Sequence, residues 1–226
     1  LGEGLDRAAA RADRVIAVPL ILNAAGHVKL EVPEQIEAAR ERHPQVAFRL
    51  ARHLGVSEPT LALVQRRLKE GMRELAVPDP RTTGVILLGR GSSDRTANGE
   101  VARLARWFYE GAEHELVDIA FTGVTHPRLE AVVRRHHLLG AMQQIIIPYY
   151  LYTGRLIDRI DEQLARLRRQ YPQTAFALAD YLGFEPEVLD LVEQRVREAV
   201  EGQGMLECDG CPHRAAAAHH HHHHHH

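Results

Sequence analysis

The feature that most constrains this 226-residue chain is an internal repeat. Residues 26–67 align with residues 154–195 without a gap, and 16 of the 42 paired positions carry the same residue. The shared residues include Pro44 with Pro172 and Phe48 with Phe176. Self-similarity over a segment of this length is typical of a chain that builds one architecture twice. We therefore predict two similar lobes.

Short apolar runs alternate with amphipathic segments along the chain. Runs bounded by turn residues are typical of buried strands, and six occur: 15–20, 46–50, 85–88, 116–121, 145–150 and 175–178. Residues 58–72 and 185–200 instead place apolar side chains three and four apart, as helices do. Alternating strands and helices predict an α/β fold in which each lobe is a parallel, flavodoxin-like sheet flanked by helices.

The lobes are expected to meet at a polar, proline-containing stretch, residues 76–84. We predict an incomplete N-terminal lobe at 1–77, a C-terminal lobe at 78–200 and a cysteine-containing tail at 201–214. Residues 215–226 are a linker and purification tag and are excluded from functional arguments. The second copy has a strand, a helix and a strand that the first copy lacks. A parallel sheet without them would expose its core, so roughly 45 further residues are expected ahead of the first copy.

The charge pattern argues against two classes of partner. The formal net charge is -2 and both signs are spread along the chain, so no field suited to nucleic acid or to an anionic membrane is present. The longest apolar stretches are far shorter than the roughly 20 residues that span a bilayer. A soluble, cytoplasmic protein is expected. Two cysteines are too few for a disulfide framework.

Two histidines follow predicted strands, where open parallel sheets bind their ligands. His27 and His53 face Arg155 and Tyr181 in the repeat alignment, so the fold itself does not require imidazole at either position. Imidazole binds divalent first-row metals and takes up a proton near neutral pH. A hydrogen-bonded structural role is the alternative for each. Glu31 shares a helical face with His27 if the helix has already begun, and is otherwise a helix-start carboxylate.

A glycine-rich turn joins the strand at 85–88 to the next helix. Gly89 and Gly91 permit a tight backbone there, and Ser92, Ser93 and Asp94 follow. Free amides in such a turn could hold a carboxylate or a phosphate. Simple capping of the helix explains the same residues equally well.

Three segments, "PLILNAAGHVKLEVP", "RHLGVSEPTLALVQRRL" and "LLGRGSSDRTANGEVARLAR", together resemble the class II chelatases. These are the two-lobed sirohydrochlorin cobaltochelatases and ferrochelatases of cobalamin and siroheme synthesis. The likeness extends over residues 1–200, and GHV followed by an acidic residue and proline is its specific part. The histidine of AGHV is a metal-site residue in that family, and His27 matches it. A second family histidine stands in a GHGS turn at the start of the first lobe, within the stretch expected ahead of residue 1. The second lobe carries the equivalent turn, with Arg90 in place of the histidine.

The resemblance implies an enzyme that inserts Co²⁺ into sirohydrochlorin, with Fe²⁺ and Ni²⁺ as other possible metals. His27 would hold the metal and, with Glu31, carry the catalytic step. The substrate-binding residues would be Arg90, Ser92, Ser93, Arg155 and His53, because arginine pairs with carboxylates and stays protonated. The alternatives are a siroheme ferrochelatase, a non-catalytic tetrapyrrole- or metal-binding protein, and a binding domain for a phosphorylated ligand.

The tail holds Cys208 and Cys211, with His213 close behind. An iron–sulfur cluster or zinc needs about four ligands, so these residues are too few unless a second subunit contributes, as in a homodimer. Some long cobaltochelatases have a similar Met- and Cys-rich C-terminal motif that binds an iron–sulfur cluster. The resemblance thus implies a cluster at Cys208 and Cys211, with free thiols as the alternative.

Overall fold

The computed structural model describes residues 1–202, apart from the side chain of His27. The chain forms two compact units, one made of residues 1–55 with the chain from residue 191 onward, the other of residues 56–190. Each unit has its own sheet, and both sheets are parallel throughout.

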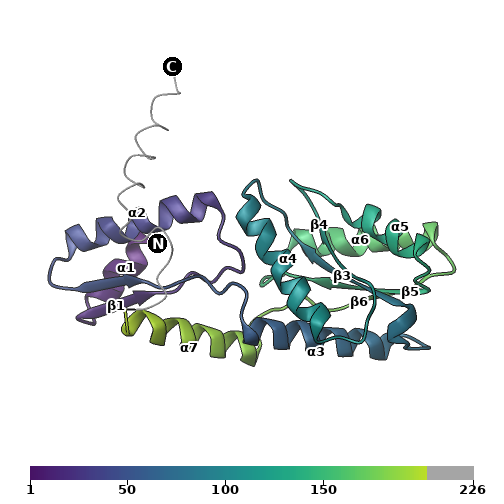
Figure 1. Cartoon of the computed structure of the whole chain (residues 1–226). Helices are drawn as coiled ribbons and strands as arrows, with labels where there is room; N and C mark the ends of the chain where they lie inside the picture. Colours follow the sequence, from purple (N-terminus) through teal and green to yellow (C-terminus); the bar gives the residue numbers. More distant parts are fainter. Residues whose placement is uncertain (203–226) are drawn as a thin grey trace, which may run out of the picture. The chain divides into compact units, whose positions relative to one another are not determined.

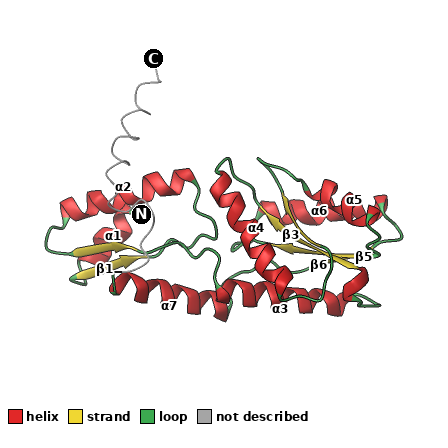
Figure 2. Cartoon of the chain, in the orientation of Figure 1, coloured by secondary structure: helices red, strands yellow, loops and turns green. Residues whose placement is uncertain are grey.

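The unit of residues 56–190 contains a four-stranded sheet in the order β4-β3-β5-β6. Its strands are β3 (Thr83–Gly89), β4 (Val117–Phe121), β5 (Gln143–Pro148) and β6 (Ala175–Leu178). Its helices are α3 (Glu58–Glu74), η1 (Pro80–Thr82), α4 (Arg95–Glu110), α5 (Leu129–Leu138) and α6 (Arg155–Gln170). Figure 2 shows the strands running between helices.

Both faces of this sheet are covered, which explains why its central strands are continuous apolar runs. Every residue of β3 and β5 is buried. Ile86 and Ile146 belong to a core cluster with Leu129 of α5 and Leu164 of α6. Neighbouring strand residues point to the opposite face. There α3 comes so close that a Cβ added to Gly71 would lie 2.9 Å from Cγ2 of Ile145.

The other unit contains a two-stranded sheet of β1 (Arg14–Ala17) and β2 (Ala47–Leu50). Its helices are α1 (Gly2–Ala9), α2 (Gly26–Arg42) and most of α7 (Pro186–Val200). Leu5 of α1 and Ile36 of α2 pack against Phe48 in one core cluster. In Figure 1, α7 runs along the other side of the strands, and Arg49 of β2 donates to the carbonyl of Val200 at 2.8 Å.

The α/β fold with parallel, helix-flanked sheets is confirmed, and all six expected strands are present within residues 1–202. The repeat is visible in individual hydrogen bonds: Arg40 donates to the carbonyl of Phe48 at 3.0 Å, and Arg168 donates to that of Phe176 at 3.3 Å. Among these same residues, no helix is long and apolar enough to cross a membrane.

The two compact units follow the packing of the helices rather than the order of the repeats along the chain. Helix α3 belongs to the first repeat but packs with the sheet of the second, and most of α7 groups with the first repeat's sheet. The two repeats therefore exchange their last helices. This exchange lets a residue of one repeat hold a loop of the other.

A buried histidine ties α5 to β4 in the larger unit. His136 is fully buried, and its Nε2 lies 2.6 Å from Oδ2 of Asp118. This hydrogen bond holds the pKa of Asp118 below its usual value. The ionised carboxylate therefore stabilises the fold above the unfolded-state pKa of about 3.9, and this contribution is lost as the pH falls through the lowered folded-state pKa.

We expect Asp118→Asn to lower the urea midpoint at neutral pH, because the variant loses the ionised partner of His136. The difference from the unchanged protein should shrink below about pH 4 and vanish at lower pH, where Asp118 is protonated in both states. Urea unfolding followed by circular dichroism between pH 2.5 and pH 7 measures it. A difference that stays constant over this range would contradict the assignment.

Candidate functional site

The carboxyl ends of three neighbouring strands in the larger unit bring together Arg90, Thr122 and Tyr150, which follow β3, β4 and β5. The Thr122 hydroxyl donates to the Arg90 carbonyl at 3.2 Å and lies 2.7 Å from the Tyr150 hydroxyl. Because the Thr122 proton is used toward Arg90, the Tyr150 hydroxyl is the donor of the second bond. The three residues form one hydrogen-bonded chain along the sheet edge.

These three hydrogen-bonded residues combine a neutral phenol, that of Tyr150, with an exposed cation, that of Arg90. Burial raises the pKa of Tyr150, while the hydrogen bond to Thr122 and the charge of Arg90 act in the opposite direction. Tyr150 is therefore a hydrogen-bond donor at neutral pH. The Arg90 side chain is exposed and stays protonated. Arg90 and Tyr150 can therefore bind anionic groups at this edge, and neither acts as a base.

The turn after β3 is held by its own hydrogen bonds. The amide of Ser92 donates to Oδ1 of Asn98 at 2.9 Å, and the Ser92 hydroxyl accepts from the amide of Asp94 at 3.0 Å. Asp94 caps α4 by accepting from the amide of Thr96 at 2.9 Å. Both hydrogen bonds of Ser92 thus hold the turn and the start of α4, as expected if these residues cap the helix. Ser93 is exposed.

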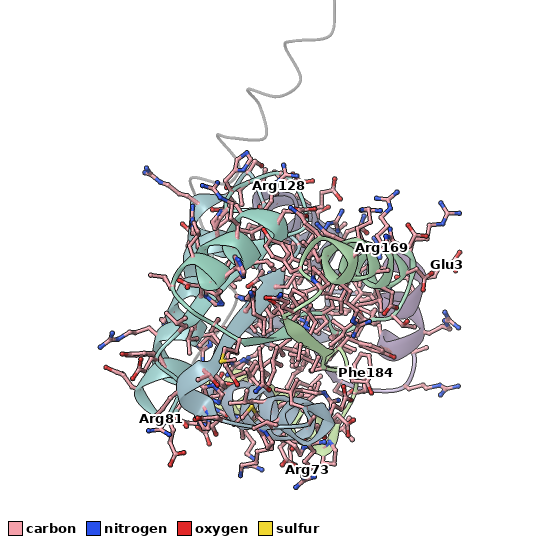
Figure 3. All side chains as sticks on the ribbon, turned by 90° about the vertical axis from the view of Figure 1, so that its right-hand side faces the viewer. Glu3, Arg73, Arg81, Arg128, Arg169 and Phe184 are labelled. Carbon is pink, nitrogen blue, oxygen red and sulfur yellow. The ribbon has the colours of Figure 1, made fainter. Side chains whose placement is uncertain are left out.

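Arg155 is the exposed first residue of α6, reached from β5 by a short loop. Two exposed aromatic side chains, Tyr152 and Phe184, lie on loops after β5 and β6, with ring centroids 5.4 Å apart in an edge-to-face arrangement. Figure 3 labels Phe184 among the side chains of this unit. Aromatic faces of this kind suit a flat, conjugated ligand.

In the smaller unit, His27 is the second residue of α2 rather than part of the preceding loop, where the sequence placed it. The helix begins directly after Ala25, whose extended backbone (φ -92°, ψ 168°) ends the loop. The condition for pairing His27 with Glu31 is therefore met: both positions are helical, four residues apart and on one face. Glu31 is exposed.

His53 follows β2, so the structure brings it to the carboxyl end of the same sheet as the segment that leads to His27. Its ring lies against Gly55, where an added Cβ would be 3.2 Å from Nε2 and where the backbone has φ +64°. The matching loop of the other unit has Tyr181 beside Gly183, at φ +67°. The same loop geometry thus presents an imidazole in one unit and a phenol in the other.

Sequence reasoning missed Thr122 and Tyr150, because Tyr150 reads as the last residue of an apolar run and Thr122 as an ordinary turn residue. Within the described residues, no group of three or more His, Cys, Asp or Glu side chains could hold a metal ion. Cys208 and Cys211 lie outside the described residues, so an iron–sulfur cluster there stays a prediction.

The family model described as CbiX matches residues 1–71 and 84–199. A sirohydrochlorin cobaltochelatase of Priestia megaterium is 37% identical over 215 residues, which cover 95% of this chain and 70% of the relative. A sirohydrochlorin ferrochelatase of Bacillus subtilis (strain 168) is 31% identical over 206 residues, which cover 91% of this chain and 76% of the relative.

Two solved structures of chelatases are also similar to this chain. SirB from Bacillus subtilis with Fe³⁺ superposes with a TM-score of 0.77 at 29% identity, covering 91% of this chain and 80% of that one. The sirohydrochlorin chelatase SirB from Bacillus subtilis subspecies spizizenii in complex with cobalt gives a TM-score of 0.72 at 26% identity, with 91% and 79% covered.

Proposed function

Because this chain belongs to the CbiX family, we propose that it is a sirohydrochlorin cobaltochelatase, an enzyme that inserts Co²⁺ into sirohydrochlorin. The observation that carries the proposal is the 37% identity to the cobaltochelatase of Priestia megaterium over 95% of this chain. Insertion of Fe²⁺ is the second candidate, supported by the ferrochelatase that is 31% identical. Imidazole ligands alone do not choose between these metals.

Insertion exchanges one divalent cation for the two protons that sirohydrochlorin carries on its pyrrolic nitrogens. In the proposed reaction the neutral imidazole of His27 binds Co²⁺ as substrate and releases it to the macrocycle. In the same proposal Glu31, one helical turn along α2, accepts a proton as it leaves. The products are the cobalt macrocycle and two protons, so no oxidant or reductant is needed.

The second repeat lacks this chemistry, since Arg155 and Arg159 stand at the positions that match His27 and Glu31. Guanidinium groups neither bind Co²⁺ nor accept a proton, but they pair with carboxylates in a fixed fork geometry. Arg90 and Arg155 would hold the acidic side chains of sirohydrochlorin. Ser93 and Ser92 in the neighbouring turn, together with His53, complete the proposed substrate-binding set.

The direct test supplies sirohydrochlorin with Co²⁺, Fe²⁺ or Ni²⁺ under anaerobic conditions and follows the absorbance change of the macrocycle. The proposal requires the largest kcat/KM for Co²⁺. A larger value for Fe²⁺ would make the ferrochelatase assignment correct. Tight binding of sirohydrochlorin without insertion of any of these metals would indicate a carrier and overturn the enzymatic proposal.

We expect Arg90→Ala and Arg155→Ala each to raise the KM for sirohydrochlorin about tenfold and to leave kcat within about threefold, because each removes binding shared by ground and transition states. Arg159→Ala, on the exposed surface of α6 one turn beyond Arg155, is the matched control and should change KM little. Steady-state kinetics at two salt concentrations measures the effect, which added salt should reduce. Equal effects of all three substitutions would argue for general charge rather than these contacts.

A further inference from the structure

A buried arginine of α7 holds the loop that carries His53. Arg195 is 3% exposed, and its Nε donates to the carbonyl of His53 at 2.9 Å while Nη2 donates to the carbonyl of Leu54 at 2.7 Å. Nη1 donates to both carboxylate oxygens of Glu198, at 3.0 and 3.1 Å. All three guanidinium nitrogens are therefore used, two of them on consecutive backbone carbonyls.

The loop is fixed from a second direction as well. The amide of Leu54 donates to the carbonyl of Ile21 at 3.1 Å, and Ile21 lies in the segment that leads from β1 to His27. Gly55 then turns the chain in the left-handed region, which leaves room for the His53 ring. With the backbone held on both sides, the direction of the His53 side chain is set by its rotamer alone.

The other unit repeats this arrangement with a different ring. Arg67 of α3 donates from Nε to the carbonyl of Tyr181 at 3.1 Å and from Nη2 to that of Leu182 at 3.0 Å. It is 5% exposed and is paired with Glu70 and Glu185. A buried arginine that donates to two consecutive carbonyls is thus common to both units, so the needs of one site do not explain it. What differs is the residue presented, His53 or Tyr181.

We propose that Arg195 is a positioning residue that orients the His53 imidazole for contact with the tetrapyrrole, an inference that rests on the proposed function. Because the last helices are exchanged, the orientation of a first-repeat imidazole depends on a second-repeat side chain. A lysine at this place carries its three donors on a single nitrogen, so it lacks the planar spacing with which Arg195 reaches two consecutive carbonyls and Glu198. Arg195→Lys therefore loosens the loop while it keeps the charge.

The experiment is a double-mutant cycle in the full chain with Arg195→Lys and His53→Ala, measured by the KM and kcat of metal insertion. We expect Arg195→Lys to raise the KM for sirohydrochlorin about tenfold, and to have little further effect once His53 is alanine. Arg67→Lys is the matched control, equally buried and with the same donors, and its effect should be the same in both backgrounds. A purely structural role for Arg195 would lower the active fraction, hence kcat, and leave KM unchanged.

Hydrogen exchange separates failure of this inference from failure of the proposed function. Amides of residues 53–56 should exchange faster in Arg195→Lys than in the unchanged protein, whatever the substrate, and should not do so in Arg67→Lys. Unchanged exchange, or additive effects on KM with His53→Ala, would overturn the positioning role. Absence of metal insertion in the unchanged protein would instead refute the proposed function. The double-mutant cycle would then use the dissociation constant of sirohydrochlorin in place of KM.

Discussion

Replacing His27 with alanine should strongly slow metal insertion while the protein still binds sirohydrochlorin. The imidazole is the only group of the proposed catalytic pair that both binds a divalent cation and exchanges a proton near neutral pH. Its loss should lower kcat about 10²- to 10⁴-fold, the usual range for removal of a positioned acid–base group. The dissociation constant of sirohydrochlorin, measured by absorbance titration without metal, should change less than about threefold, because the proposed carboxylate contacts come from other residues.

His137→Ala is the matched control for this substitution. His137 is an exposed histidine in the last turn of α5, where its ring contacts that of Tyr171 with centroids 5.0 Å apart. Because α5 returns to the amino end of the parallel sheet, His137 lies at the edge opposite to the carboxyl ends of the strands. Its substitution should leave kcat and KM nearly unchanged. Equal loss of insertion and of tetrapyrrole binding in His27→Ala would assign His27 a structural role.

The repeat and the strand pattern were sufficient to predict the α/β class, all six observed strands and the parallel sheets. Strand ends were less well placed: the run at 145–150 forms a strand over Gln143–Pro148, because Tyr149 and Tyr150 continue beyond the ladder. The exchange of α3 and α7 could not be predicted in this way. Both helices present the same type of apolar face. The sequence pattern therefore predicts that each helix covers a sheet, but it does not predict which of the two similar sheets.

The residues of the proposed site stand out in the sequence where they depart from the repeat, and are hidden where tertiary contacts give them their role. His27 and Arg155 are visible as unlike residues at matched positions, and the structure places them at the starts of α2 and α6. Arg195 and Arg67, by contrast, are the same residue in both repeats and read as surface charges of amphipathic helices. Only the fold shows that each is buried on two carbonyls of a distant loop.

Among single substitutions near Arg90, at the carboxyl end of β3, Gly91→Ala should be one of the most destabilising. Gly91 has φ +88°, and an added Cβ would lie 2.0 Å from the carbonyl oxygen of Gly123, which is backbone and cannot rotate away. The turn would have to move, breaking the hydrogen bond from the amide of Gly123 to the Arg90 carbonyl, now 3.1 Å long. We expect a loss of about 2 to 4 kcal/mol in the free energy of unfolding, from strain and lost contacts together.

The same movement displaces Arg90 and the Thr122 hydroxyl bonded to its carbonyl, so the KM for sirohydrochlorin should rise in whatever Gly91→Ala protein remains folded. Gly99→Ala, eight residues further in α4, is the matched control, because its added Cβ meets nothing within 4 Å beyond its chain neighbours and the backbone of its own helix. Its helical position predicts a gain of up to about 1 kcal/mol and normal kinetics. Urea unfolding and steady-state kinetics test both variants. Similar stability of the two proteins would show that the turn tolerates a side chain and that Arg90 is not held as described.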